Sequence, residues 1–474
     1  MTVNEKYYRP DPRFKDLGLK FADPVTPAEF PKHILRFRND RAAAHVGLET
    51  LNDDEWVRHF GHFDPLPDNM TKPLAMRYHG HQFRTYNPDL GDGRGFLFAQ
   101  MRDRDGRLLD LGTKGSGRTP WSRSGDGRLT LKGAVREALA TEMLGALGLD
   151  TSETFSLIET GEQLYRNDEP SPTRSAVMVR LNHSHIRIGS FQRHAFNDDS
   201  DAIRVLMDHA IDTCFPDLQS LGAKDRPAGF VAAVSRNVAR LAAGFMAYGF
   251  AHGVLNTDNI NVTGESFDYG PYRFVPTFDP DFTPAYFDQT GLYAYGRQPE
   301  ALHWNLARLA ECFLPLAPRE ALVEAIGEYG GALNDELRRA YFRRLNLAHR
   351  DTGEDDALLQ SLLAFLKESQ APYEQVLFDW QGGLESASRT AQSPAAHTYQ
   401  GPTFDAFRDR LEGYCPADPE KLSHPYFNQT RPCTMLIDEI EDIWSAIADR
   451  DDWTPFRQKI DEIAIVRDAN SLLT

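Results

Sequence analysis

The hydrophobic pattern of the chain changes its period near residue 200, and this change restricts the fold more than any other feature of the sequence. Between residues 90 and 181, short apolar runs alternate with glycine-containing turns, a pattern typical of antiparallel strands. The pair Asp105-Gly106 is a strong hairpin signal between two of these runs. Strands are therefore expected at residues 96–101, 108–114, 155–159 and 175–181.

Beyond residue 200 the apolar side chains recur at helical spacing. The strongest stripe runs from Phe230 to Tyr248 in alternating steps of four and three residues. One helix is also expected inside the β region, at residues 130–148, where every fourth residue is apolar. Further helices are expected at residues 300–314, 319–345, 355–368 and 434–448.

This order of elements predicts an α+β fold with a small, mainly β N-terminal lobe that carries one key helix and a large helical C-terminal lobe. Protein kinases have this two-lobed order, although many other α+β enzymes would satisfy it. Residues 1–90 are rich in Pro, Asp and aromatic residues and are expected to form an irregular extension packed on the kinase-like core. Residues 91–200 would be the N-terminal lobe with nucleotide-binding loops, and residues 201–474 the helical lobe with a catalytic and metal-binding segment.

Net charge and cysteine content exclude several classes of protein. A formal charge of -17 disfavours broad binding to nucleic acids or anionic membranes, because phosphate groups attract clustered Lys and Arg. The four scattered cysteines form no CxxC pair, which favours a reducing compartment. The start MTVNEKYYRPDPRF resembles neither a signal nor a transit peptide, and no apolar run is long enough to span a bilayer. We expect a cytoplasmic protein without nucleic-acid or membrane partners.

The segment HGVLNTDNINVTGESFDYGP, residues 252–271, partly matches the catalytic segment of protein kinases. His252 and the asparagine at 259 keep the H-R-D-L-x-x-x-N spacing, and Asp268-Tyr269-Gly270 stands where D-F-G would. The position of the kinase catalytic aspartate, however, holds Val254.

Oxygen ligands in this segment suit a hard cation. Asn259 and Asp268 offer an amide oxygen and a carboxylate, so Mg²⁺ or Mn²⁺ is the expected metal, with nucleotide phosphates and waters as further ligands. Asp258 is the remaining carboxylate that can take a proton from an attacking hydroxyl. An Asx-rich turn without catalytic role is the alternative.

Three earlier segments carry candidate phosphate-binding residues. In LGDGRG, the turn glycines Gly91 and Gly93 would let backbone amides approach a phosphate and Arg94 would add charge, although alone the signal is weak and an ordinary turn between strands is the commoner explanation. In MVRLNHSHIRIGSF, Arg180 and Arg187 can clamp a polyphosphate, whereas the two histidines are expected to be structural.

The third segment is DLGTKGSGRTPWSRSGDGR, residues 110–128. It is not a Walker A loop, because its lysine precedes the glycines. Lys114 ends an expected strand and Glu137 lies in the following helix, which reproduces the kinase pair in which a glutamate orients a phosphate-binding lysine. An ordinary solvated pair is the alternative. The loop between them, which includes Asp126 and Gly127, is basic in an acidic protein.

With these motifs together, the chain resembles the selenoprotein O family, the kinase-like protein adenylyltransferases. The blocks that carry the resemblance are HGHQF, LGDGRG, KGSGRTPWSRSGDGR with VREALATEM, RLNHSHIRIGSF, HGVLNTDN with DYGP, and WNLARLAECFLPL. The resemblance implies a kinase fold that binds ATP in a flipped orientation and transfers AMP to Ser, Thr or Tyr hydroxyls of proteins. UTP is a further candidate nucleotide.

Site roles follow from the resemblance residue by residue. It implies Asp258 as general base and Asn259 and Asp268 as metal ligands. The nucleotide would be held by Lys114 with its partner Glu137, and by Arg180, Arg187, Gly91, Gly93, Arg94, Asp126 and Gly127.

The sequence also departs from the family. Asn182 stands where a proline is usual, residues 277–289 are longer and more acidic than expected, the C-terminal portion matches poorly, and no selenocysteine or redox tail is present. Two alternatives stay open: a conventional kinase that transfers the γ-phosphoryl group with Asp258 as base, and a catalytically inactive, nucleotide-binding pseudokinase scaffold.

Overall fold

An antiparallel sheet forms the centre of the N-terminal half in the computed structural model, which describes residues 3–471. Its spatial order is β1 (Ala22–Pro24), β3 (Leu74–Met76), β6 (Leu97–Arg102), β7 (Leu108–Lys114), β10 (Thr173–Asn182), β9 (Glu153–Leu164) and β2 (Ile34–Arg38), with β8 (Leu129–Thr130) paired to β10. The four strands expected from the sequence are present, and β6 and β7 form the hairpin that turns at Asp105-Gly106. Strands β9 and β10 are both longer than expected.

The side chains of the sheet alternate between two faces, and this alternation positions the site. On β10, Val177 and Val179 point into an aromatic-rich core beneath helices α1 (Asp40–His45) and α2 (Asp53–Phe60). Met178 and Arg180 therefore point to the opposite face, against which helix α3 (Leu131–Leu147) packs. Lys114, the direct neighbour of Met178 across the strands, lies on that same face.

Residues 3–90 are not irregular, contrary to the expectation from the composition of residues 1–90. They supply three strands of the main sheet, β1, β2 and β3, and the helices α1 and α2. These strands have three to five residues each, too few to show a period of two. Trp56 of α2 is fully buried and stacks on Phe155 of β9, so this region shares a core with the sheet.

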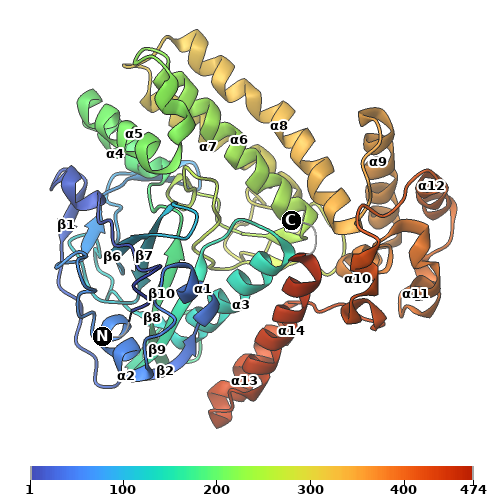
Figure 1. The fold of residues 1–474 in the computed structure, drawn as a ribbon, viewed down its shortest axis with the longest axis horizontal. Coiled ribbons are helices and arrows are strands. Elements are labelled where there is room, and N and C mark those ends of the chain that lie inside the picture. Colours follow the sequence, from blue (N-terminus) through green and yellow to red (C-terminus); the bar gives the residue numbers. More distant parts are fainter. Residues whose placement is uncertain (1–2, 472–474) are drawn as a thin grey trace.

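Helices dominate the rest of the chain (Figure 1). The region begins earlier than expected, at α4 (Ile188–Phe196), followed by α5 (Ser200–Cys214). Helices α6 (Arg226–Ala247) and α8 (Arg319–Leu345) pack along each other, with α7 (Gln298–Cys312) against α6. The predicted stripe from Phe230 to Tyr248 is the buried face of α6.

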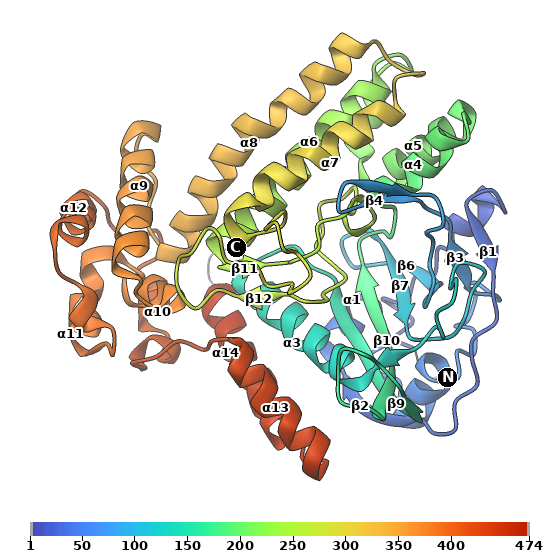
Figure 2. The ribbon, with the colours of Figure 1, turned by 180° about the vertical axis from the view of Figure 1, so that it is seen from behind.

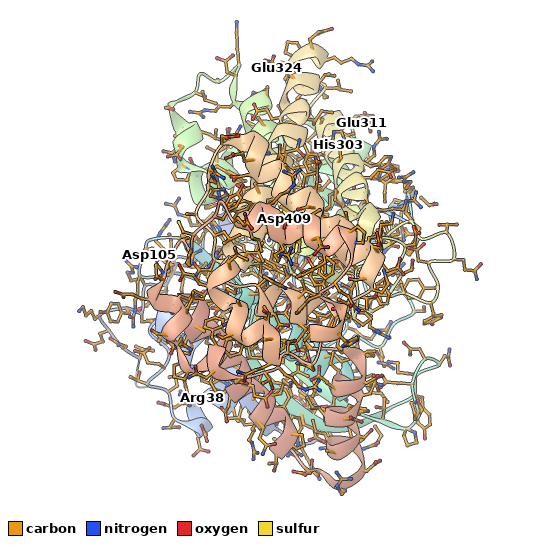
Figure 3. The ribbon with its side chains drawn as sticks, turned by 90° about the vertical axis from the view of Figure 1, so that its right-hand side faces the viewer. Arg38, Asp105, His303, Glu311, Glu324 and Asp409 are labelled. Carbon is orange, nitrogen blue, oxygen red and sulfur yellow. The ribbon has the colours of Figure 1, made fainter. Side chains whose placement is uncertain are left out.

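The C-terminal helices form two groups. Helices α9 (Thr352–Ser369), α10 (Tyr373–Asp379), α11 (Ala387–Gln392) and α12 (Pro402–Leu411) gather at one end of the molecule, seen end-on in Figure 3 with Asp409 of α12 toward the viewer. Helices α13 (Ile437–Arg450) and α14 (Thr454–Ser471) return to α3 (Figure 2). Arg467 of α14 donates to the Glu142 carboxylate of α3 at 2.6 Å, which fixes this return.

The segment that most resembles a kinase motif connects two short strands, β11 (Phe250–Ala251) and β12 (Arg273–Phe274). Residues 257–259 within it form a single 3-10 turn. A small hairpin, β4 (Gly80–Gln82) and β5 (Thr85–Asn87), packs against that turn, where the Thr257 hydroxyl accepts a hydrogen bond from the His81 amide at 2.7 Å. The HGHQF motif thus supports the 3-10 turn.

Candidate active site

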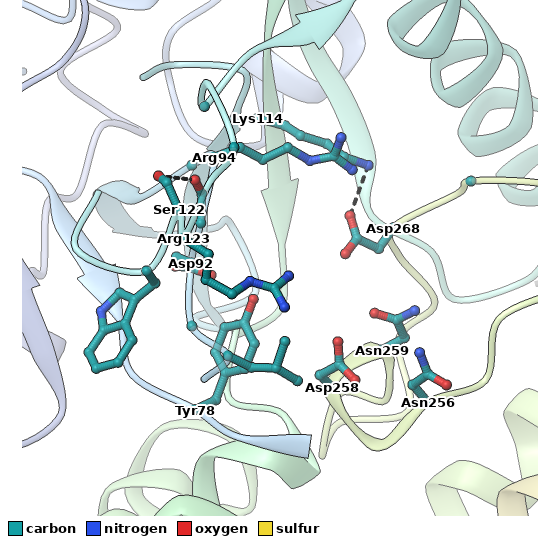
Figure 4. A pocket seen from close by; sticks show the side chains of 18 of the residues that line it. Tyr78, Asp92, Arg94, Lys114, Ser122, Arg123, Asn256, Asp258, Asn259 and Asp268 are labelled. Atoms are coloured by element: carbon teal, nitrogen blue, oxygen red, sulfur yellow. Dashed lines mark hydrogen bonds and ion pairs between the residues drawn. The ribbon is translucent and has the colours of Figure 1, made fainter. Parts of the chain in front are cut away.

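One cavity of about 710 Å³ lies where the sheet meets the segment between β11 and β12 (Figure 4). Most of its lining comes from the glycine-rich turn before β6, the loop after β7 and residues 254–271, and the rest includes Arg180 of β10 and Arg187 at the start of α4. The structure brings together every site residue expected from the sequence. Those that line the cavity are Gly91, Gly93, Arg94, Lys114, Asp126, Gly127, Arg180, Arg187, Asp258, Asn259 and Asp268, and Glu137 lies directly behind Lys114.

Lys114 and Glu137 form a buried ion pair. The Lys114 Nζ lies 2.5 Å from a Glu137 carboxylate oxygen, and the two residues are only 5% and 1% exposed. The alternative of an ordinary solvated pair is therefore wrong, because both side chains are buried. The same Nζ lies 2.9 Å from Asp268 Oδ1, so Glu137 directs the ammonium group toward the cavity side of the segment (Figure 4).

Two buried guanidinium groups extend this positive cluster. Arg180 Nη1 lies 3.0 Å from Asp268 Oδ1 and 3.3 Å from the Glu137 carboxylate. Arg187 donates to the Asp258 carbonyl at 3.1 Å and stacks over the Tyr78 ring. In both arginines the Nε donor is buried without an acceptor in the described part of the chain. Buried donors of this kind suit an anionic ligand with several oxygens, such as a polyphosphate.

Asp268 stands at the centre of the cluster in a left-handed backbone conformation, with φ of 67°. Burial alone would raise the pKa of its carboxyl, but Lys114 and Arg180 hold that pKa well below its ordinary value. Oδ1 accepts from both cations, and Oδ2 is left for another ligand. The carboxylate is thus fully ionised at neutral pH.

Asn259 presents an oxygen beside this carboxylate. Its amide nitrogen donates to the Val254 carbonyl at 3.0 Å, which turns its side-chain oxygen toward the cavity (Figure 4). An amide oxygen and an ionised carboxylate together fit a hard divalent cation, which prefers oxygen ligands and keeps several from solvent or phosphate. Val254, in the place of the kinase aspartate, therefore contributes a backbone carbonyl that orients Asn259.

Asp258 has one carboxylate oxygen without a protein donor. It is 8% exposed, and its Oδ1 is buried without a hydrogen-bond donor in the described residues. Burial raises the pKa of Asp258 to about 6. A Cβ at Gly80 would lie 2.9 Å from this oxygen, so the glycine of HGHQF makes room for it. A carboxylate with these properties can accept a proton at neutral pH.

Close packing requires the glycines at the opposite wall of the cavity. A Cβ at Gly91 would lie 2.3 Å from the Trp121 ring, and one at Gly93 would lie 2.9 Å from the Trp121 carbonyl. Gly127 has a φ of 70° and approaches the backbone of Gly117 closely. These glycines let the turn before β6 and the loop after β7 lie against each other, which shapes the cavity wall.

Other residues of the cavity were not singled out by the sequence. Arg166 binds the Asp126 carboxylate at 2.9 Å, so Asp126 is not a free acid here. The Asn256 side-chain oxygen accepts from the Tyr293 hydroxyl at 2.7 Å and from the Phe83 amide. Cavity residues that motif spacing did not reveal are Tyr78, Asp92, Trp121, Arg123, Arg128, Arg166 and Asn256. Asp92, Trp121, Arg123, Arg128 and Asn256 lie inside the quoted motifs, and Tyr78 immediately precedes HGHQF. Only Arg166 had no nearby signal in the sequence.

Glu265, three residues before Asp268, lies outside the cavity and has an elevated pKa. Burial raises the pKa of Glu265 to about 8, although its carboxylate accepts from the His183 amide and the Asn182 side chain. A carboxyl whose pKa is raised by folding is harder to ionise in the folded protein than in the unfolded chain. The folded state therefore loses stability as the pH rises toward the folded-state pKa. We expect the melting temperature to fall between about pH 5 and pH 8 through this group, and to fall less in Glu265→Gln. Equal pH dependence of the two proteins in calorimetry would contradict this.

The fold and the cavity together define an α+β protein with a basic, partly buried site suited to a nucleoside polyphosphate and a divalent cation. The family model described as "Protein adenylyltransferase SelO" matches residues 4–464. The chain belongs to this family, as its motifs indicated.

Relatives in the family align along nearly the whole chain. The "Protein nucleotidyltransferase YdiU" of Synechocystis sp. is 42% identical over 473 residues, covering 96% of this chain and 97% of the relative. The protein of the same name from Gloeobacter violaceus is 43% identical over 472 residues, covering 94% and 93%. That of Vibrio cholerae is 38% identical over 392 residues, covering 82% and 78%. The poor match expected for the C-terminal portion is wrong, because the family model reaches residue 464.

Two further features bear on earlier expectations. Cys214, Cys312, Cys415 and Cys433 are all free thiols. Among residues 3–471, the structure contains no helix whose length and apolarity would let it cross a bilayer.

Proposed function

We propose that the chain is a protein adenylyltransferase that transfers AMP from ATP to Ser, Thr or Tyr hydroxyls of other proteins. The observation that carries the proposal is that one cavity contains a basic cluster and, apart from it, a carboxylate that can accept a proton. Lys114, Arg180 and Arg187 form a buried cluster for phosphate, whereas Asp258 offers a carboxylate oxygen without a protein donor. Family membership supports the same reaction.

The proposal includes a kinase-like, two-lobed fold. Residues 91–200 would form the N-terminal lobe together with the strands and helices of residues 3–90, and residues 201–474 would form the helical lobe. Support comes from the buried Lys114–Glu137 pair between β7 and α3, and from the metal-ligand pair between β11 and β12.

Transfer begins with attack by the acceptor hydroxyl oxygen on the α-phosphorus of ATP. Asp258 takes the hydroxyl proton as the new oxygen–phosphorus bond forms. The bond between the α-phosphorus and the bridging oxygen breaks on the opposite side, and pyrophosphate leaves with its charge stabilised by Lys114 and Arg180. The products are an adenylylated side chain and pyrophosphate.

The proposal includes a flipped orientation of ATP relative to kinases. The basic cluster is buried and would hold the γ-phosphate and β-phosphate, which leaves the α-phosphate on the side of Asp258. Asn259 and Asp268 would hold Mg²⁺ or Mn²⁺, which supplies positive charge to the phosphate oxygens when bound. UTP would present the same phosphates, so a uridylyl transfer by the same residues is part of the proposal.

Intact-mass spectrometry of an acceptor protein after incubation with ATP and Mg²⁺ tests the proposal. The expected increase is that of one adenylyl group. An increase of one phosphoryl group would support the conventional kinase instead, and an unmodified acceptor beside metal-dependent ATP binding would support the inactive pseudokinase scaffold.

A further inference from the structure

Two neighbouring aromatic side chains protrude from the acidic loop between β12 and α7. Tyr286 is 82% exposed and Phe287 is 46% exposed, and their rings lie 5.2 Å apart in an edge-to-face arrangement. Tyr286 has the largest exposed fraction among the large apolar side chains of residues 3–471. Paired, exposed aromatic rings are unfavourable in water unless they serve a contact.

The loop that carries them has a defined conformation. The buried carboxylate of Asp288 accepts from the Leu292 amide at 2.9 Å and from the Tyr293 amide at 2.8 Å, which closes the turn after Phe287. The Phe287 ring also packs edge-on against Phe83, with 5.8 Å between ring centroids. The two aromatics are therefore held at the surface.

The loop is also joined to the mouth of the cavity. Phe83 donates its amide to the Asn256 side chain, which lines the cavity, and its ring contacts Tyr293 at 5.0 Å. On the other side, Pro284 packs over Gly253, where a Cβ would lie 2.9 Å from the proline ring. Gly253 immediately precedes Val254 of the cavity wall. These contacts link the loop that carries the aromatic pair to the segment that holds Asp258.

The loop that carries the pair also carries two exposed carboxylates. Asp279 and Asp281 are exposed on the same loop and form no ion pair within the part of the chain that the structure describes. The nearby cations are already engaged, because Arg84 and Arg297 both lie against Glu300, at 3.5 and 3.9 Å. Lys and Arg side chains satisfy both features at once, since they stack on aromatic faces and pair with carboxylates.

We propose that Tyr286 and Phe287, with Asp279 and Asp281, form a docking surface for a basic segment of the acceptor protein. A Lys or Arg near the acceptor hydroxyl would stack on the aromatic pair, and its neighbours would face the two carboxylates. This places the hydroxyl at the mouth of the cavity beside Asp258. The inference rests on the proposed function, because it names the substrate class of the same site.

Direct peptide binding tests the docking surface independently of transfer. Two fluorescein-labelled peptides share one central Ser and differ only in flanking residues, Lys and Arg in one and Glu in the other. We expect the wild-type protein to bind the basic peptide at least about tenfold more tightly by anisotropy, a difference that charge reversal and stacking can supply. Tyr286→Ser with Phe287→Ser should remove this difference, and Asp279→Lys with Asp281→Lys should reverse the preference.

Val323→Ser, at an apolar side chain that is 57% exposed on α8, is the matched control and should bind both peptides as the wild type does. Equal binding of both peptides by the wild type, or unchanged binding by Tyr286→Ser with Phe287→Ser, would overturn the docking surface. Because the readout is binding, a failure of AMP transfer would leave this result intact and count against the proposed function alone.

Discussion

Replacing Asp258 with Asn is expected to slow AMP transfer about 10²- to 10⁴-fold, the range that a positioned general base contributes. Asn keeps the shape of the side chain and removes only the ability to accept the hydroxyl proton. The Arg187 guanidinium donates to the backbone carbonyl of residue 258, so this contact survives the substitution. ATP affinity should therefore stay close to that of the wild type, and the loss should appear in kcat.

The stability of Asp258→Asn separates a chemical role from a structural one. Burial raises the pKa of Asp258 to about 6, so its ionised form destabilises the fold at neutral pH. The neutral amide should leave the melting temperature unchanged or higher while activity is lost, as is typical of functional residues held in unfavourable surroundings. A large fall in melting temperature, or transfer at the wild-type rate, would contradict the assignment of Asp258 as base.

Asp268→Ala is expected to reduce transfer about 10³-fold or more, because the cavity loses both a metal oxygen and the partner that orders two cations. The nucleotide binding of this variant has a distinctive signature. The Asp268 carboxylate lies within 3.0 Å of both Lys114 and Arg180 and offsets their charge, so its removal should preserve or strengthen binding of metal-free ATP. Added Mg²⁺ should no longer tighten that binding.

Titration calorimetry with and without Mg²⁺ measures this signature. Asp356→Ala is a suitable control, since that aspartate pairs with Arg338 in the helical region far along the chain and should leave both affinities unchanged. Retention of the Mg²⁺ effect in Asp268→Ala would contradict the assignment of this carboxylate to the metal.

The sequence predicted the elements whose periodic pattern is long or strong. Helix α8 has the predicted bounds, Arg319–Leu345, and strand β7 has the predicted bounds Leu108–Lys114. The strands of residues 1–90 escaped detection because they are too short for a period to emerge. Their pairing partners lie far along the chain, as when β2 pairs with β9, so only the tertiary fold reveals them.

For the candidate site, sequence motifs indicated the residues that bear charge and missed those that shape the cavity. Lys114 and Glu137 could be paired in advance because a strand and the next helix each fix one of them. Asn256 could not, because its role depends on contacts with Phe83 and Tyr293 from distant segments. Trp121 explains Gly91 by packing, and no spacing rule connects those two positions.

Incubation with ATP labelled separately on the α- and γ-phosphates tests the central claim most directly. The acceptor protein should gain α label and no γ label, and pyrophosphate should be released in equal amount. Asp258→Asn should transfer the α label only at its reduced rate. Transfer of γ label to protein, with none from the α position, would contradict adenylyl transfer by this cavity.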